Sequence, residues 1–158
     1  MKRKERAASH RGDVALQYDM EYLRVTERQY EGLRELHAAY KREIGENAPS
    51  EEDFTRLFGA VDRGEILFFG CAEGDRLVGC CSVSPVFSTY DYGCSGLFED
   101  FYILPEWRHS GIARELVRYS FRESGVSTLI VGSAECDKDM YVSLGFVAEL
   151  GHMLAFHN

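Results

Sequence analysis

Apolar and polar residues alternate with two periods along the chain, a helical period in the first third and a strand period directly after it. Residues 22–25, Tyr-Leu-Arg-Val, predict a short strand. Thr26 and Gln29 have the spacing of a capping box, and an apolar stripe of helical period follows them, with His37 on that stripe. Ser50 precedes a second such stripe and is a typical N-cap residue. We therefore predict one strand followed by two helices, with His37 packed in the core.

A β-hairpin is predicted after the second helix. Residues 66–69 and 77–83 are apolar runs of strand type, and they flank the turn residues 73–75. Residues 97–104 form a further strand, which ends at Pro105 because proline lacks the N–H that a central strand needs. A loop that contains residues 88–96 connects these strands.

The last third of the chain returns to alternating helices and strands. The pattern predicts a helix over about 110–123, a buried strand at 128–131, a short helix before Gly145, and a closing strand or hairpin over 146–156. The complete order is β-α-α-β-β-β-α-β-α-β. This order is typical of an α/β fold in which helices flank one mixed sheet.

The length of 158 residues and the apolar content of 45% fit one compact domain. Residues 1–19 show no periodic apolar pattern, so we expect a flexible basic arm or an extension upstream of the domain. Residues 20–158 are then the domain itself. The basic N-terminus is not followed by an apolar stretch of the kind found in secretory signals, and no apolar run has the length of a membrane span. We expect a cytoplasmic protein that does not bind membranes.

The charge is unevenly distributed. Residues 1–19 hold five basic and three acidic side chains, so the net charge of −8 becomes −10 for the remaining residues. Such a field repels nucleic acid and attracts cationic small molecules, although many acidic proteins are merely soluble. We expect no nucleic-acid partner.

The cysteines indicate reduced thiols and no metal site. Their number is odd, no C-x-x-C spacing occurs, and no histidine lies at metal-ligand spacing from them. Two of them are adjacent, so in a strand their side chains point to opposite faces. The five are Cys71, Cys80, Cys81, Cys94 and Cys136.

A strand that stops at Pro105 and turns at once into a helix is the most informative feature of the sequence. A helix N-terminus presents N–H groups without intrahelical partners and a partial positive charge, which suit a diphosphate. In this turn Gly111 permits close approach of the backbone, Ala113 keeps the helix near the sheet, and Arg108 adds positive charge. An ordinary strand-turn-helix connection explains these residues equally well.

This turn resembles the GNAT superfamily of N-acetyltransferases, whose signature is R/Q-x-x-G-x-G/A after the fourth strand. The segment 108–113, Arg-His-Ser-Gly-Ile-Ala, fits it in full. An acidic residue in the preceding strand, within 99–104, and a Y-x-x-x-G-F element at 141–146 strengthen the resemblance, which covers about residues 20–157. Residues 87–92 and 98–101 also look like the corresponding parts of spermidine/spermine N-acetyltransferases.

The resemblance implies acetyl-CoA as co-substrate. Backbone N–H groups of the turn would hold the diphosphate, the strand before it would pair with pantetheine, and a backbone N–H near Phe101 would polarise the thioester. Many family members carry an asparagine seven residues before the tyrosine, where this chain has Ala134, which puts that contact in doubt. The expected coenzyme residues are Phe101, Tyr102, Ile103, Arg108, His109, Ser110, Gly111, Ile112 and Ala113.

Two side chains are candidates for the chemistry. Glu99 is placed to take a proton from the acceptor ammonium, directly or through water, and Tyr141 to give one to the departing thiolate. Alternation along a regular strand places Asp100 on the face opposite Glu99. The alternatives are that the carboxylates pair with arginines and that Tyr141 is a packing aromatic. Signatures of serine hydrolases, P-loop NTPases and dinucleotide-binding dehydrogenases are absent from the sequence.

Tyr90, Asp91 and Tyr92 are candidates to bind the acceptor, through cation–π and charge contacts, or form a simple surface loop. The sequence thus predicts transfer of an acetyl group from acetyl-CoA to a primary amine, a small cationic one, in a ternary complex. The alternatives are an acetyltransferase for protein or peptide amines and a regulatory domain that binds acyl-CoA without catalysis. A homodimer is compatible with the sequence.

Overall fold

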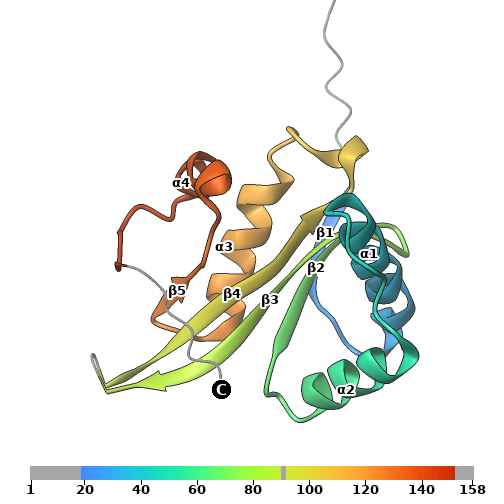
Figure 1. The fold of residues 1–158 in the computed structure, drawn as a ribbon, viewed down its shortest axis with the longest axis horizontal. Helices are drawn as coiled ribbons and strands as arrows, with labels where there is room; N and C mark the ends of the chain where they lie inside the picture. The colour runs from blue at the N-terminus through green and yellow to red at the C-terminus, as the bar shows by residue number, and fades with distance from the viewer. Residues whose placement is uncertain (1–18, 90–91, 152–158) are drawn as a thin grey trace, which may run out of the picture.

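A five-stranded sheet with helices on both faces forms the centre of the computed structural model, which describes residues 19–89 and 92–151 (Figure 1). Across the sheet the order is β1-β2-β3-β4-β5, with antiparallel pairing except between β4 and β5, which are parallel. The predicted α/β class with one mixed sheet is therefore confirmed. The strands are β1 (Met20–Arg24), β2 (Leu67–Glu73), β3 (Arg76–Ser88), β4 (Gly93–Ile103) and β5 (Thr128–Ile130). The helices are α1 (Tyr30–Glu43), α2 (Glu51–Asp62), α3 (Ile112–Ser124) and α4 (Lys138–Leu144).

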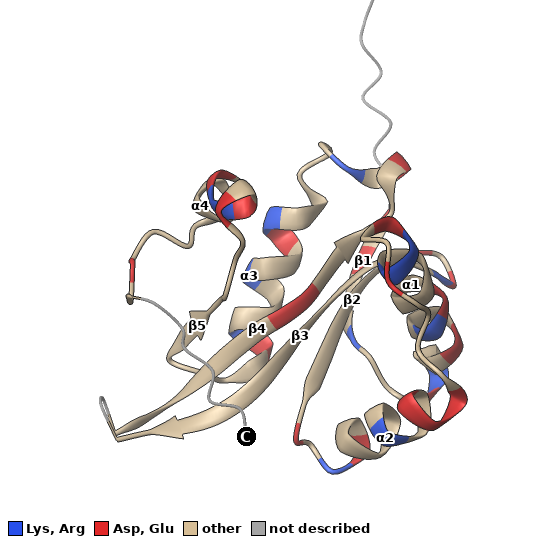
Figure 2. Ribbon diagram, viewed as in Figure 1, with Lys and Arg blue, Asp and Glu red and all other residues tan. Residues whose placement is uncertain are grey.

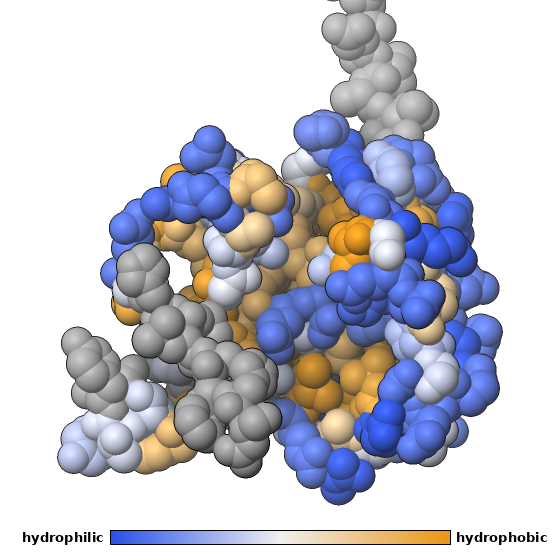
Figure 3. All heavy atoms as spheres, viewed as in Figure 1, coloured by the Kyte–Doolittle hydropathy of each residue, from blue (hydrophilic) through white to orange (hydrophobic). Residues whose placement is uncertain are grey.

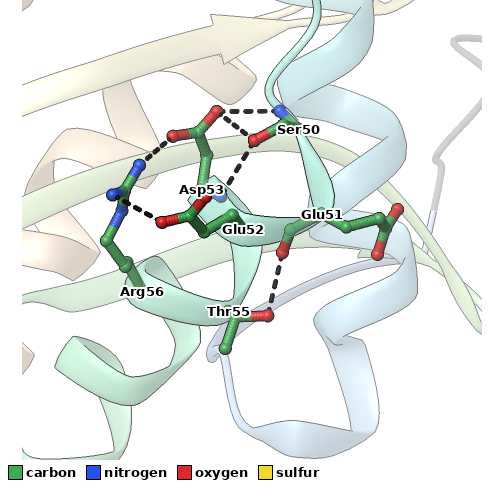
Figure 4. A network of polar contacts seen from close by, with 6 residues as sticks. All are labelled: Ser50, Glu51, Glu52, Asp53, Thr55 and Arg56. Carbon is green, nitrogen blue, oxygen red and sulfur yellow. Dashed lines mark hydrogen bonds and ion pairs between the residues drawn. The ribbon is translucent and has the colours of Figure 1, made fainter.

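The first two helices begin at the predicted caps. The backbone N–H of Thr26 donates to Gln29 Oε1 at 3.0 Å, before a single 3-10 turn leads into α1. At the start of α2, Ser50 Oγ accepts from the Asp53 N–H at 3.2 Å and the Ser50 N–H donates to Asp53 Oδ2 at 2.8 Å (Figure 4). Arg56 then binds Asp53 at 2.6 Å, one turn further along the helix. These local bonds satisfy N–H groups that a helix leaves without partners.

Apolar side chains fill a layer on each face of the sheet. The layer under α1 includes Leu33, Leu36, Phe68, Leu77 and Cys80, and the layer under α3 includes Phe69, Cys81, Val83, Phe98 and Leu116. The adjacent cysteines thus point to opposite faces, as the strand period predicts. All five cysteines are free thiols.

The elements of the C-terminal part follow the prediction up to Gly145, except that β5, expected to be buried, is exposed at Thr128 and only half-buried at its other two residues. Helix α4 ends at Gly145, which has φ 115°, a left-handed conformation that favours glycine. Residues 146–151 form no strand, and the rest of the predicted closing segment lies outside the described residues. The proposed N-terminal arm also lies outside them. None of the described helices is long and apolar enough to cross a membrane.

Candidate active site

Strands β4 and β5 pair over only a short stretch. Their pairing runs from Ser95 opposite Thr128 to Leu97 opposite Ile130, where β5 ends. Within the described residues, no strand pairs with this edge of β4 beyond Leu97, although Tyr102 and Ile103 still pair with β3 on the other side. The backbone of β4 from residue 98 onward therefore presents an open edge, the arrangement that an extended ligand needs to add itself to a sheet.

A β-bulge lies in β4 at the start of this open edge. The register between β3 and β4 shifts between Cys80 and Ser82, and Asp100 has φ 51°, a rare value for a residue with a side chain. Ser82 is paired with Glu99, so these two side chains share a face, and Ser82 Oγ donates to Asp100 Oδ2 at 2.8 Å. The bulge has therefore turned Asp100 toward the face of Glu99. The prediction from regular alternation, which placed Asp100 on the opposite face, is wrong.

The two carboxylates form the acidic segment of β4, drawn red between α1 and α3–α4 in Figure 2. The Glu99 side chain is open to solvent, whereas Ser82 is fully buried behind the pair. Partial burial raises the pKa of Glu99, and the charge of Asp100 raises it further, while the remaining exposure limits the effect. A carboxylate with a raised pKa is a better proton acceptor at neutral pH.

Tyr141 lies on α4 beside the open edge of β4. Its ring centre is 6.3 Å from that of Phe101 and 5.7 Å from that of Phe146. Burial raises the pKa of Tyr141 to about 12, with smaller contributions from the charges of Asp137 and Tyr40. The phenol is therefore protonated at neutral pH and able to donate a proton. Tyr141 also packs against aromatic neighbours, so the structure is compatible with both roles considered for it.

The turn between β4 and α3 contains two left-handed residues. His109 has φ 60° and Gly111 has φ 87°, and a Cβ built on Gly111 would meet no atom within 4 Å. The Ser110 hydroxyl donates to the carbonyl of Trp107 at 2.6 Å and so closes the turn from inside. Helix α3 begins directly after it at Ile112. The N–H groups of the first helical turn thus face an open surface, which suits a phosphate ligand.

The side chain of Arg108 does not extend over this helix N-terminus. Arg108 Nη2 donates to both carboxylate oxygens of Glu43, at 2.7 and 2.9 Å, and Nε donates to the carbonyl of Ile103 at 2.8 Å. Glu43 is the last residue of α1. The positive charge that the sequence assigned to the diphosphate is thus paired with a carboxylate.

The hairpin tip between β3 and β4 is remote from Glu99. Tyr92 is exposed and precedes β4, seven positions before Glu99, which corresponds to about 23 Å along an extended strand. Tyr90 and Asp91 lie outside the described residues. The structure thus does not bring Tyr92 together with the carboxylates.

Three side chains near residues 99–102 of β4 were not singled out as functional by the sequence. Ser82 is a polar residue inside an apolar run, which is a usable signal of a special role. Tyr40, on α1, has its ring centre 5.6 Å from that of Tyr102. His37 is buried, as predicted, between Phe54 and Phe68, but its Nε2 atom has no hydrogen-bond partner among the residues that the structure describes.

Figure 3 shows that this side of the molecule is hollowed between α1 and α3–α4, with apolar surface in its depth. A separate cavity of about 460 Å³ lies beside α1 and includes Leu36, Leu77 and Leu104 in its lining. Neither Glu99 nor Tyr141 lines it. No group of three or more potential metal ligands occurs among the described residues.

The model of the acetyltransferase (GNAT) domain family matches residues 64–148. No curated protein sequence matches the chain. Among solved structures, a probable acetyltransferase is similar with a TM-score of 0.74 at 22% identity, over 87% of this chain and 99% of that one. An aminoglycoside acetyltransferase from an uncultured soil metagenomic sample, in complex with sisomicin, has a TM-score of 0.75 at 16% identity, over 88% and 95%. Glucosamine-6-phosphate N-acetyltransferase from Arabidopsis thaliana has a TM-score of 0.67 at 14% identity, over 88% and 99%. At these low sequence identities, the structural similarity shows that the fold is shared.

Proposed function

Since the chain belongs to the GNAT acetyltransferase family, we propose that it transfers an acetyl group from acetyl-CoA to a small cationic primary amine. The observation that carries this proposal is the pair Glu99 and Asp100, which share one face of β4 beside its open edge. Two carboxylates in a hollow attract an ammonium group, and the raised pKa of Glu99 suits it to take the ammonium proton.

The residues that would hold acetyl-CoA fit an extended ligand with a diphosphate. The free edge of β4 over Phe101, Tyr102 and Ile103 offers backbone groups for pantetheine, and a backbone N–H near Phe101 is the candidate to polarise the thioester carbonyl. The turn over 108–113, with its left-handed residues His109 and Gly111, offers N–H groups to the diphosphate. The contribution of this turn comes from its backbone, since the Arg108 side chain is bound to Glu43.

The proposed reaction removes two protons from the acceptor nitrogen and delivers one to the thiolate. Glu99 accepts a proton from the ammonium group, directly or through water, and this frees the lone pair of the nitrogen. The neutral amine then forms the C–N bond to the acetyl carbon, the nitrogen loses its second proton to solvent, and the C–S bond breaks. Tyr141 donates its phenolic proton to the thiolate and is reprotonated from solvent. The pKa of about 12 keeps this phenol protonated until that step.

The preference for a cationic acceptor rests on charge. The chain carries a net charge of −8, and the aromatic rings of Tyr40 and Tyr102 lie on the same side of the sheet as Glu99. Aromatic faces and carboxylates together bind alkylammonium groups. Two structural neighbours are named for amino-sugar substrates, which agrees with an amine acceptor.

An acceptor screen tests the proposal. Release of free thiol from acetyl-CoA is measured with polyamines, aminoglycosides, amino acids and peptides at matched concentration. We expect the highest kcat/KM with a small multiply charged amine. Activity confined to peptides would assign the enzyme to protein amines, and binding of acetyl-CoA without turnover across the screen would indicate a regulatory domain.

A further inference from the structure

Arg108 is the first residue of the family signature, yet its side chain is bound to the end of α1. Its guanidinium donates to both oxygens of Glu43, at 2.7 and 2.9 Å, and to the carbonyl of Ile103 at 2.8 Å. Hydrogen bonds between arginine and a carboxylate are charge-assisted, and the planar guanidinium fixes their direction. The contact therefore sets the orientation of the chain where it leaves β4 and enters the turn.

Tyr102 completes this cluster. Its hydroxyl donates to Glu43 Oε2 at 3.1 Å, and the Arg108 guanidinium carbon lies 5.4 Å from the centre of its ring. The hydrogen bond from Arg108 lowers the pKa of Glu43, and burial together with Glu43 raises the pKa of Tyr102. At neutral pH the carboxylate is thus charged and the phenol protonated, the states in which all of these bonds form.

The cluster joins the end of α1 to the end of β4 and the turn after it, which are remote from α1 in sequence. Glu43 ends α1, Ile103 ends β4 and Arg108 begins the turn toward α3, with 65 positions between Glu43 and Arg108. The Arg108 and Glu43 side chains are 35% and 43% exposed, so solvent screens their attraction in part. The main effect of the ion pair between Arg108 and Glu43 is then geometric, because the pair fixes the turn against α1.

We propose that Glu43 is a positioning residue for the coenzyme turn: it holds Arg108 so that the backbone N–H groups after residue 108 are oriented toward the diphosphate. In this arrangement the Arg108 side chain is not itself a phosphate ligand. The inference rests on the proposed function in one respect, that this turn binds CoA.

An arrangement in which Arg108 binds the diphosphate predicts the opposite effect of a Glu43 substitution on CoA affinity. If Arg108 left Glu43 to contact a phosphate, the Glu43 carboxylate would compete with the ligand for the same guanidinium. Removing its charge would then strengthen CoA binding. If Glu43 positions the turn, removing its charge weakens CoA binding, because the turn loses its fixed orientation.

The test is calorimetric titration of CoA into the wild-type protein and into Glu43→Gln, Arg108→Gln and the double variant. We expect each single variant to weaken binding about threefold to tenfold, in the range of a partly exposed ion pair with charge-assisted bonds. The double variant should bind CoA no more weakly than the single variant with the lower affinity, because both substitutions break the same contact. Unchanged or tighter binding by Glu43→Gln, or additive losses, would overturn the proposal.

Two further variants separate positioning from charge and from folding. Arg108→Lys keeps the positive charge but loses the planar fork, so it should bind CoA as weakly as Arg108→Gln; wild-type affinity would indicate a phosphate ligand. Glu46→Gln is the matched control, because Glu46 follows α1 closely and pairs with Lys41 at 2.5 Å instead of Arg108. It should leave CoA affinity unchanged. Equal Tm values for all variants would show that the losses are not unfolding.

Turnover supplies an independent readout. For Glu43→Gln we expect the KM for acetyl-CoA to rise while kcat at saturation stays within about twofold of the wild type, as for a loss of uniform binding. A fall in kcat alone would contradict the inference. Absence of CoA binding to the wild-type protein would refute the proposed function and this inference together, whereas normal wild-type binding with an unaffected Glu43→Gln variant refutes only the inference.

Discussion

Ser82 donates a hydrogen bond of 2.8 Å to Asp100, across the bulge at which β3 and β4 change register. Ser82 is fully buried, so this bond anchors Asp100 from inside the sheet. The consequence concerns Glu99, which is paired with Ser82 and next to Asp100 in sequence. Partial burial raises the pKa of Glu99, and repulsion from the Asp100 carboxylate on the same face raises it further.

Asp100→Asn is predicted to lower the pKa of Glu99. The substitution keeps the shape of the side chain and removes the charge that disfavours ionisation of Glu99. The acid limb of the pH profile of kcat/KM should therefore move to lower pH, and the solvent exposure of Glu99 keeps this movement small. Ser82→Ala is the control, because it removes the hydrogen bond but keeps the charge, and it should move the limb less. An acid limb that stays in place in Asp100→Asn would show that the two carboxylates do not interact.

Gly111→Val is predicted to weaken CoA binding by tenfold or more, which corresponds to about 1.4 kcal/mol. Valine at φ 87° is strained, and its branched side chain would occupy the open surface over the turn. Gly64→Val is a matched control, since Gly64 also has a left-handed φ, 71°, and no atom within 4 Å of a built Cβ. Both variants should lose similar stability in thermal melts, but only Gly111→Val should lose affinity in calorimetry. Equal affinities of the two variants would remove the diphosphate from this turn.

The sequence predicted the parts of the fold that depend on local pattern. The caps at Thr26 and Ser50 and the turn at Gly111 were found because each depends on a few adjacent residues. The face of Asp100 was predicted wrongly, because alternation assumes a regular strand and nothing local announces the bulge. The contact between Glu43 and Arg108 could not be predicted, since it joins residues 65 positions apart whose proximity only the packing of α1 creates.

Tyr141→Phe is predicted to lower kcat and to leave CoA affinity unchanged. The substitution keeps the ring that packs against Phe101 and Phe146 and removes only the proton donor. General acid assistance is worth about 10²- to 10⁴-fold, so a loss of that size is expected in steady-state kinetics where chemistry limits the rate. Tyr119→Phe is the control, because that tyrosine is also partly buried but packs against Tyr22 and Phe69. Equal kcat values for the two variants would make Tyr141 a packing residue.

Acidification is predicted to destabilise the protein through His37. Burial lowers the pKa of His37 below 6.5, against the opposing charge of Asp100 and with the charge of Lys41. Below about pH 6.5 the unfolded chain therefore binds a proton that the folded chain excludes, so stability falls as the pH falls. His37→Leu removes this group from the apolar layer. Thermal melts from about pH 7.5 to 5.5 should show a smaller loss of Tm in the variant than in the wild type, and parallel curves would contradict the assignment.

Glu99→Gln tests the base and the acceptor together. An alkyl ammonium group has a pKa near that of lysine, about 10.4, so almost all of the acceptor is protonated at neutral pH and must lose a proton before it attacks the thioester. Without Glu99 the reaction depends on the small fraction of the acceptor amine that is neutral in solution, and this fraction falls tenfold for each unit by which the pH is lowered. We therefore expect the ratio of kcat/KM of the variant to that of the wild type to be smallest between the pKa of Glu99 and neutral pH. The CoA affinity of the variant should be unchanged.

The same variant separates proton removal from attraction of the cation. Asp100 remains in Glu99→Gln and still attracts an ammonium group, so the KM for a cationic acceptor should change less than kcat. In Asp100→Asn the KM should rise more for a doubly charged amine than for a singly charged one, because the attraction scales with the charge of the acceptor. The profiles are measured with one polyamine and one monoamine at constant ionic strength. If the profile of Glu99→Gln superimposes on that of the wild type, proton removal must proceed through water or the acceptor's own equilibrium, and Glu99 is not the base.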